Sequence, residues 1–195
     1  MAAVGVRPPV IVLLAVWAMA LAGAFLAPMA LPGDNPDDVV TRQTARVAVL
    51  FWGLAAGAIL LRRREIGRWA WTLGCIAFVV HVVTAFDRMH GWSNSAAVRH
   101  VEEVSGFGWG LLVSYAFTAL WVVDVCWWWL DRDGYDSRED WLDRGIHAFM
   151  AFIVFNGTVV YEPGFIRWIG LALFVALGVL LTMRLWPGRK VRPST

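Results

Sequence analysis

Imidazole and carboxylate side chains gather in one polar stretch of this sequence. His81, His90 and His100 are three of the four histidines in the chain, and Asp87 and Glu103 lie in the same stretch. These side chains are common ligands of zinc, iron and copper. The sequence therefore presents a candidate transition-metal site, although the spacing of the three histidines matches no established metal motif.

A structural interpretation of the same stretch stays open. Ser93 or Ser95 is placed to cap a short helix, which would put His100 and Glu103 three residues apart on one helix face. In this interpretation His81 hydrogen bonds to a neighbouring helix, and the other histidines are ordinary loop and surface residues. The sequence alone does not decide between joint ligation and separate roles.

Four further polar residues fall inside or beside apolar stretches: Asp124, Arg144, His147 and Asn156. Polar side chains are costly at membrane depth, so each one is expected to have a partner or a role. The link between the stretches that hold Asp124 and His147 is short, which predicts antiparallel neighbouring helices. We expect Asp124 to face the interior and to contact His147, Arg144 or Arg184, as a pair that fixes helix register or as part of a proton or ion route.

Several enzyme classes are disfavoured. The histidine boxes of membrane desaturases are absent, as are the GxSxG, HExxH and P-loop patterns. His81 and His147 are expected at opposite ends of the bundle, which disfavours a haem held by two histidines. Asp124 is the single aspartate deep in an apolar stretch, whereas intramembrane aspartyl proteolysis needs two. Cys75 and Cys126 lie in apolar runs without metal spacing, and we expect them to be reduced.

Membrane helices must position these side chains. The chain is 59% hydrophobic and 16% charged with a mean hydropathy of +0.59, whereas roughly a quarter of the residues in a soluble domain are charged. Its 195 residues leave room for one polytopic membrane domain and for no separate soluble domain. The basic residues are scattered between apolar runs, so the expected partner is the lipid bilayer and not nucleic acid.

Six apolar stretches are long enough, or nearly so, to cross a hydrocarbon core of about 30 Å. They cover residues 8–31, 44–61, 68–86, 108–130, 145–161 and 164–186. We predict an all-α bundle of six transmembrane helices, with a short extracytoplasmic helix between the third and the fourth. The first stretch follows Arg7 as a signal peptide would, but it is longer than the usual core of about 7 to 15 residues, so we expect a retained helix.

Charge placement predicts the orientation of the bundle. With the N-terminus inside, 12 of the 17 Lys and Arg residues fall in cytoplasmic segments and five fall outside. Cytoplasmic loops are enriched in these residues, so both termini are expected in the cytoplasm of a bacterial-type inner membrane. Most of the 13 tryptophans lie near predicted helix ends, as indole rings prefer the interface between membrane and water.

Small residues recur every four positions in two of the predicted helices. They are Gly53 and Gly57 in one, and Gly106, Gly110, Ser114 and Thr118 in another. Such faces allow close helix approach within one chain, in a homo-oligomer or with another membrane protein. Three functions remain as hypotheses: an accessory or structural subunit, a metal-binding or redox protein with an outward-facing site, and a small transporter or channel.

Overall fold

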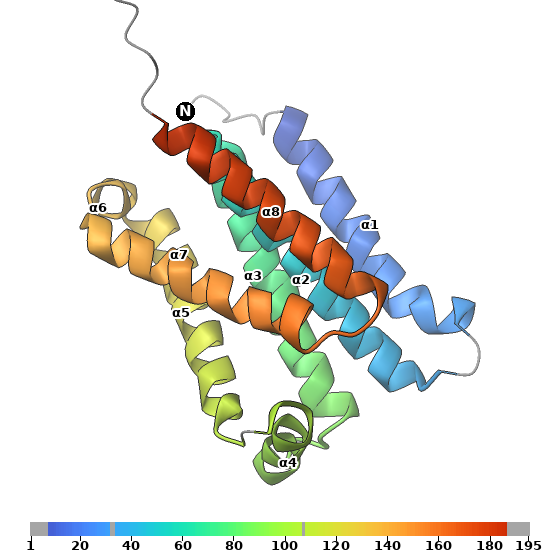
Figure 1. Cartoon of the computed structure of the whole chain (residues 1–195). Coiled ribbons are helices and arrows are strands. Elements are labelled where there is room, and N and C mark those ends of the chain that lie inside the picture. Colours follow the sequence, from blue (N-terminus) through green and yellow to red (C-terminus); the bar gives the residue numbers. More distant parts are fainter. Residues whose placement is uncertain (1–7, 32–33, 107, 187–195) are drawn as a thin grey trace, which may run out of the picture.

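The computed structural model describes residues 8–31, 34–106 and 108–186 (Figure 1). Within these residues all the regular structure is helical. The elements in chain order are α1 (Pro8–Ala30), α2 (Pro36–Leu60), α3 (Arg64–Arg88), α4 (Asn94–Ser105), α5 (Gly110–Leu130), α6 (Arg132–Asp136), α7 (Asp140–Phe155), the π-helical turn η1 (Asn156–Val160) and α8 (Phe165–Leu185). The predicted all-α class is confirmed for the described part of the chain.

Five of these helices are long and apolar enough to cross a membrane: α1, α2, α3, α5 and α8. Each of them has 21 to 25 residues. The fifth predicted segment, residues 145–161, is not one continuous α-helix, because α7 ends at Phe155 and η1 follows it. The helix predicted between the third and fourth segments exists as α4, and Ser93 caps it by accepting a 3.3 Å hydrogen bond from the backbone N–H of Ala96.

Helix α2 begins eight residues before the predicted boundary at residue 44. The side chain of Asn35 accepts a 3.0 Å hydrogen bond from the backbone N–H of Asp37, and Pro36 occupies the first helical position. Asp37 and Asp38 lie in the first turn, where carboxylates interact favourably with the positive end of the helix dipole. A polar, capped first section therefore extends the apolar helix.

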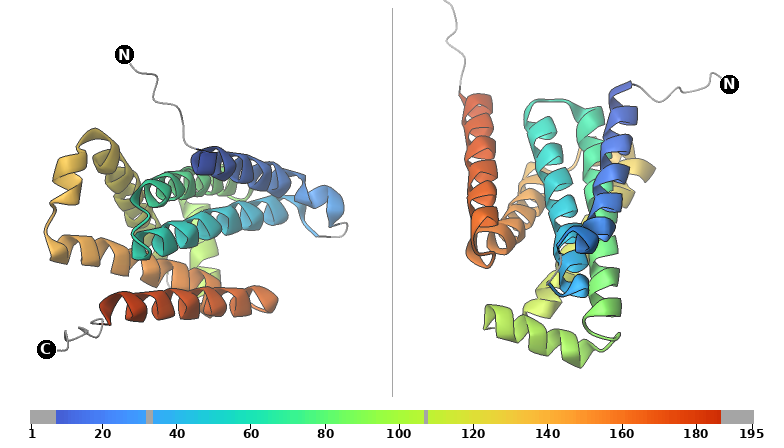
Figure 2. Two further views of the ribbon diagram at one scale, coloured as in Figure 1. Left: turned by 90° about the horizontal axis from the view of Figure 1, so that it is seen from above. Right: turned by 90° about the vertical axis from the view of Figure 1, so that its right-hand side faces the viewer.

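The antiparallel pair α2 and α3 forms the centre of the bundle (Figures 1 and 2). Helices α1 and α8 pack on different sides of α2, and α5 packs on α3. The chain passes repeatedly between two ends of the bundle. One, the α6 end, holds α6, the start of α1, the turn from α2 to α3 and the end of α8; the other, the α4 end, holds α4, the link from α1 to α2 and the segment before α8.

Close helix packing depends on glycines at two contacts. A Cβ atom at Gly53 would lie 2.9 Å from the Leu173 side chain of α8, so the small face of α2 packs within this chain. A Cβ atom at Gly74 would lie 3.0 Å from the Trp121 ring and 3.2 Å from the backbone nitrogen of Trp52. Gly74 thereby lets buried Trp121 bring α5 against α3.

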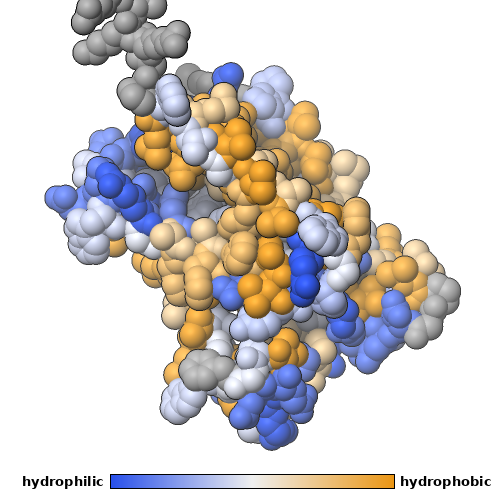
Figure 3. Space-filling view, viewed as in Figure 1, coloured by the Kyte–Doolittle hydropathy of each residue, from blue (hydrophilic) through white to orange (hydrophobic). Residues whose placement is uncertain are grey.

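Hydrophobic side chains cover much of the outer surface. Figure 3 shows them over α8 and α1, while hydrophilic side chains gather around α4 and α6 at the two ends. The exposed apolar residues of α8 include Val175, Val179 and Leu181. An apolar belt between two polar ends is the distribution that a bilayer requires.

Candidate functional site

A buried carboxylate lies near the α6 end of the bundle. Asp124 is on α5, and its side chain is fully buried. Its Oδ1 atom lies 2.6 Å from Nη1 of Arg138, and its Oδ2 atom accepts a 3.0 Å hydrogen bond from the Tyr135 hydroxyl. Asp124 thus faces the interior, but no hydrogen bond or ion pair among the described residues joins it to the predicted partners His147, Arg144 or Arg184. Its partners come instead from the segment between α5 and α7.

Arg138 joins this carboxylate to helix α7. Its side chain is only 2% exposed, and its Nε donates a 2.9 Å hydrogen bond to Oδ1 of Asp143, which Nη2 also contacts. The guanidinium carbon lies 4.0 Å from the centre of the Tyr135 ring. We call Asp124, Tyr135, Arg138 and Asp143 the buried ion cluster.

Burial and neighbouring charges shift the pKa values of the two donors in the cluster, Arg138 and Tyr135. Burial alone would lower the pKa of Arg138, but its hydrogen bond to Asp143 and the charge of Asp124 raise that pKa above its ordinary value. Burial, and next the negative charge of Asp124, also raise the pKa of Tyr135. Arg138 therefore stays a cation and Tyr135 stays a neutral donor at any physiological pH.

The local fold of α6 explains how these donors reach Asp124. The side chain of Asp131 accepts a 2.9 Å hydrogen bond from the backbone N–H of Gly134, which starts a single helical turn. A Cβ atom at Gly134 would lie 2.0 Å from Oδ2 of Asp131, so a larger residue there would displace the Asp131 side chain from its capping position. Tyr135 then stacks on Trp128 of α5, with ring centres 4.5 Å apart and planes at 5°.

His147 lies one helical turn after Asp143 on α7. Its ring centre is 5.3 Å from that of Trp71, which in turn is 5.3 Å from that of Trp121. Within the described residues, the buried Nδ1 of His147 and the indole nitrogens of Trp71 and Trp121 have no hydrogen-bond partner. His147 thus borders the buried ion cluster without a hydrogen bond to Asp124.

Two other predicted partners of Asp124, Arg144 and Arg184, lie elsewhere, and both are exposed. Arg144 forms an exposed pair with Asp140, 2.6 Å apart, because α7 begins at Asp140 and turns Arg144 away from the face of Asp143. Its prediction as a buried residue was wrong. Arg184 instead donates a 3.1 Å hydrogen bond to the backbone carbonyl of Ile59.

Asn156 is satisfied within its own helix. Its amide donates a 2.7 Å hydrogen bond to the backbone carbonyl of Phe152, at the point where α7 passes into η1. This contact uses the amide to support a widened helical turn. Asp124 and Asn156 therefore lie in two separate hydrogen-bonded groups.

The structure brings two of the predicted metal ligands together. The ring centres of His90 and His100 are 5.3 Å apart. Partial burial, and next the positive charge of His100, lower the pKa of His90. Asp87 accepts a 3.2 Å hydrogen bond from the Trp92 indole, and Glu103 is exposed on α4.

The third predicted histidine has a different partner. Nδ1 of His81 lies 2.9 Å from the backbone carbonyl of Thr41, which ties α3 to α2. Among the residues that the structure describes, no three His, Cys, Asp or Glu side chains are grouped so as to hold a metal ion. Joint ligation by His81, His90, His100, Asp87 and Glu103 stays a prediction.

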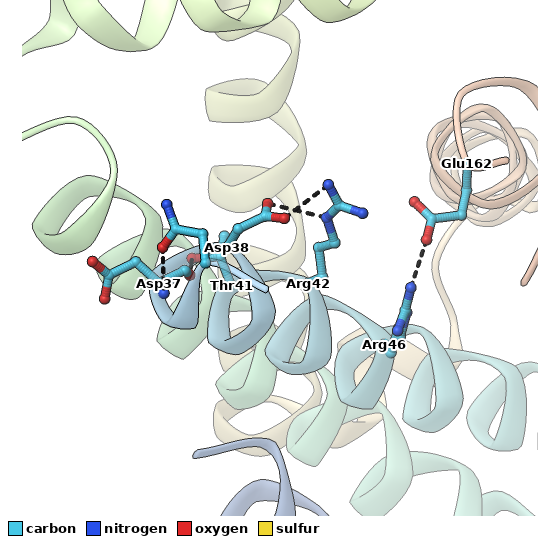
Figure 4. A network of polar contacts seen from close by, with 7 residues as sticks. Asp37, Asp38, Thr41, Arg42, Arg46 and Glu162 are labelled. Atoms are coloured by element: carbon cyan, nitrogen blue, oxygen red, sulfur yellow. Dashed lines mark hydrogen bonds and ion pairs between the residues drawn. The ribbon is translucent and has the colours of Figure 1, made fainter. Parts of the chain in front are cut away.

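A second set of charged contacts lies on α2 toward the α4 end (Figure 4). Arg42 pairs with Asp38 of its own helix at 2.8 Å. Arg46 pairs at 2.6 Å with Glu162 from the segment before α8. The second pair fixes the start of α8 against α2.

The sequence interpretation missed Tyr135, Arg138 and Asp143 as partners of Asp124. A signal was present, because the short segment after α5 holds several charges of both signs and lies nearest in sequence to the buried carboxylate. In the arrangement found, both oxygens of Asp124 accept from donors. Its chemistry is that of a buried cross-link between α5, the α6 segment and α7.

Comparison with known proteins identifies no relative: no family model matches the chain, and no characterised protein or solved structure is significantly similar to it.

Proposed function

We propose that the chain is an accessory or structural subunit of a bacterial-type inner membrane, with six membrane crossings and both termini in the cytoplasm. The path of the chain supports the sixth crossing. Helix α5 ends at the α6 end of the bundle, and α8 starts at the α4 end. Between them α7 and η1 together have 21 residues, or about 31 Å of helix, which is close to the thickness of the hydrocarbon core.

The charge distribution supports the orientation. Arg62, Arg63 and Arg64 are consecutive in the turn from α2 to α3 at the α6 end, where Arg138 and Arg184 also lie. The positive-inside rule assigns this end to the cytoplasm. The α4 end then faces outward.

The observation that carries the structural role is the complete burial of Asp124 together with its pairing. A carboxylate that relays protons or binds ions needs a route to solvent, whereas this side chain is fully buried and both its oxygens accept hydrogen bonds from side chains that join three segments. Such a contact stabilises helix positions and leaves transport or catalysis to a partner protein. The role of the chain is then to offer a rigid apolar helical bundle to a partner protein in the membrane.

Asp124→Asn tests this role, with Asp140→Asn as the matched control. Both variants remove one carboxylate charge at the α6 end, but Asp140 is exposed. We expect Asp124→Asn to lose folded, monodisperse protein in mild detergent and Asp140→Asn to retain it. A folded Asp124→Asn protein that loses a transport or enzymatic activity of the host membrane would contradict the structural role.

A second candidate function rests on the His90 and His100 contact. Two imidazoles at this separation form part of a zinc, iron or copper site if a further ligand comes from a partner or from solvent. Elemental analysis of protein purified without chelator tests it. Stoichiometric metal that disappears in His100→Gln would favour the metal-binding function over the purely structural one.

A further inference from the structure

A hollow with basic walls lies at the α6 end of the bundle, between the last turns of α2 and α8. Its volume is about 330 Å³. Two arginines and four apolar residues line it: Leu60, Leu61, Arg62, Leu180, Met183 and Arg184. Both helices are apolar enough to span a membrane, so their shared end lies at the level of the lipid head groups.

The position of Arg184 is fixed by the protein backbone. Its Nη1 donates a 3.1 Å hydrogen bond to the carbonyl of Ile59, which belongs to the last turn of α2. That carbonyl also accepts a 3.1 Å hydrogen bond from the backbone N–H of Arg62, and the last-turn carbonyls carry partial negative charge, so a guanidinium is stabilised there. One nitrogen of Arg184 is used in this way, and its other donors are left for a ligand.

Arg62 follows the last turn of α2 in a left-handed backbone conformation. Its φ is +58°, in the region that a non-glycine residue rarely occupies. The backbone N–H groups of Arg62 and Arg63 donate hydrogen bonds of 3.1 Å and 2.8 Å to the carbonyls of Ile59 and Ala58, an arrangement that commonly ends a helix. It turns the chain from α2 toward α3 and leaves Arg62 on the wall of the hollow.

The two arginines of this wall form no ion pair within the described residues. Among residues 8–31, 34–106 and 108–186, neither Arg62 nor Arg184 forms one, whereas neighbouring Arg64 pairs with Asp136 at 2.7 Å. Asp143 is close enough to interact electrostatically with Arg184, but its ion pair is with Arg138. The hollow therefore presents two guanidinium groups beside an apolar surface.

We propose that this hollow binds an anionic phospholipid of the inner leaflet, with its phosphate on Arg62 and Arg184 and an acyl chain along α8. The proposal rests on the membrane-spanning role proposed above. Arginine matches phosphate oxygens in geometry and charge, and basic hollows between transmembrane helices are suited to anionic head groups. Exposed Val175 and Val179 continue the apolar surface of α8 away from the hollow.

The lining of the hollow favours a lipid over a helix of another protein. Its two arginines lie beside four apolar side chains, as a charged head group and an acyl chain require. A zwitterionic lipid would bring a positive group toward two arginines, so the net negative lipid is preferred.

Native mass spectrometry of the full chain in detergent, with added phosphatidylglycerol or phosphatidylcholine, tests the proposal. We expect tighter binding of phosphatidylglycerol to the unaltered protein. Arg62→Gln and Arg184→Gln are each expected to weaken that binding about fivefold, since one juxtamembrane basic residue contributes about 1 kcal/mol and 1.4 kcal/mol is tenfold. Arg144→Gln removes an exposed arginine outside the hollow and is expected to change nothing.

A second variant distinguishes binding in the hollow from attraction to the positive charges alone. Met183→Trp keeps both arginines and places a bulky ring in the hollow, and we expect it to reduce phosphatidylglycerol binding. Arg62→Gln leaves the bond from Arg184 to Ile59 intact, so a folding defect in Arg184→Gln does not obscure the result.

Three outcomes would overturn the lipid site. They are equal binding of both lipids, equal weakening by Arg144→Gln, and complete competition by millimolar inorganic phosphate, which would identify free phosphate as the ligand. Loss of the lipid preference with six crossings intact refutes the lipid site alone. A five-crossing topology with the preference intact refutes the proposed membrane arrangement alone.

Discussion

Arg138→Met isolates the energetic contribution of the buried ion cluster. Methionine keeps an unbranched apolar side chain of similar reach and removes the guanidinium. Asp124, which is fully buried, then keeps only the Tyr135 hydroxyl as a donor. Asp143 also loses its partner, but its side chain is 47% exposed and water solvates it.

The magnitude follows from the burial of both charges. Removing one partner of a buried ion pair costs about 3–5 kcal/mol, because the other charge stays buried and uncompensated. The exposed pair of Arg144 and Asp140 contributes about 0–1 kcal/mol, so Arg144→Met is the matched control. Adding Asp124→Asn to Arg138→Met removes the buried carboxylate charge that has lost its partner. The double variant is expected to recover at least about 2 kcal/mol of the free energy of unfolding.

Reversible unfolding of the purified protein in mixed micelles, at increasing mole fraction of sodium dodecyl sulfate, measures these differences. We expect a large loss in free energy of unfolding for Arg138→Met and partial recovery in the double variant. A loss no greater than that of Arg144→Met would refute the cluster as a stabilising contact. Strict additivity of the two substitutions would refute their direct coupling.

Two further predictions concern packing and pH. Gly74→Ala is expected to destabilise the bundle by about 1–3 kcal/mol in the same unfolding assay, because the new methyl group meets a tryptophan ring and a backbone nitrogen, whereas Gly23→Ala has open space and should not destabilise it. The pKa of His90, followed by NMR, is expected below 6.5 and to rise in His100→Gln. Unfolding then takes up a proton, so the stability linked to His90 is intact above pH 6.5 and decreases as the pH falls from 6.5 toward the folded pKa; a His90 pKa above 6.5 would contradict this.

The apolar helices follow from the sequence because lipid imposes a simple rule on composition. The predicted boundaries of α1, α5 and α8 differ from the observed ones by no more than two residues. The start of α2 was missed because hydropathy does not detect a polar helical turn. Asn35 followed by Pro36 is a capping signature that predicts the start of a helix at this position, since caps and first-turn prolines depend only on neighbouring residues.

The partners of Asp124 could not be predicted from local sequence in this way. Its burial follows from its place in an apolar stretch, but the contact with Arg138 spans 14 residues and depends on the turn of α6. The helical turn of α6 is itself stabilised by the Asp131 cap, which accepts a hydrogen bond from the backbone N–H of Gly134. Similarly, the bond from His81 to the Thr41 carbonyl requires knowledge of where α2 begins, which hydropathy placed too late.

Cysteine accessibility on the two sides of α7 tests the six-crossing arrangement most directly. Ser137 precedes α7, Phe165 follows η1, and both are exposed. In a background without Cys75 and Cys126, intact bacterial cells expressing Ser137→Cys or Phe165→Cys are treated with a membrane-impermeant maleimide. We expect Phe165→Cys to be labelled in intact cells and Ser137→Cys only after permeabilisation. Labelling of both positions from the same side would contradict a crossing by α7 and with it the six-crossing account.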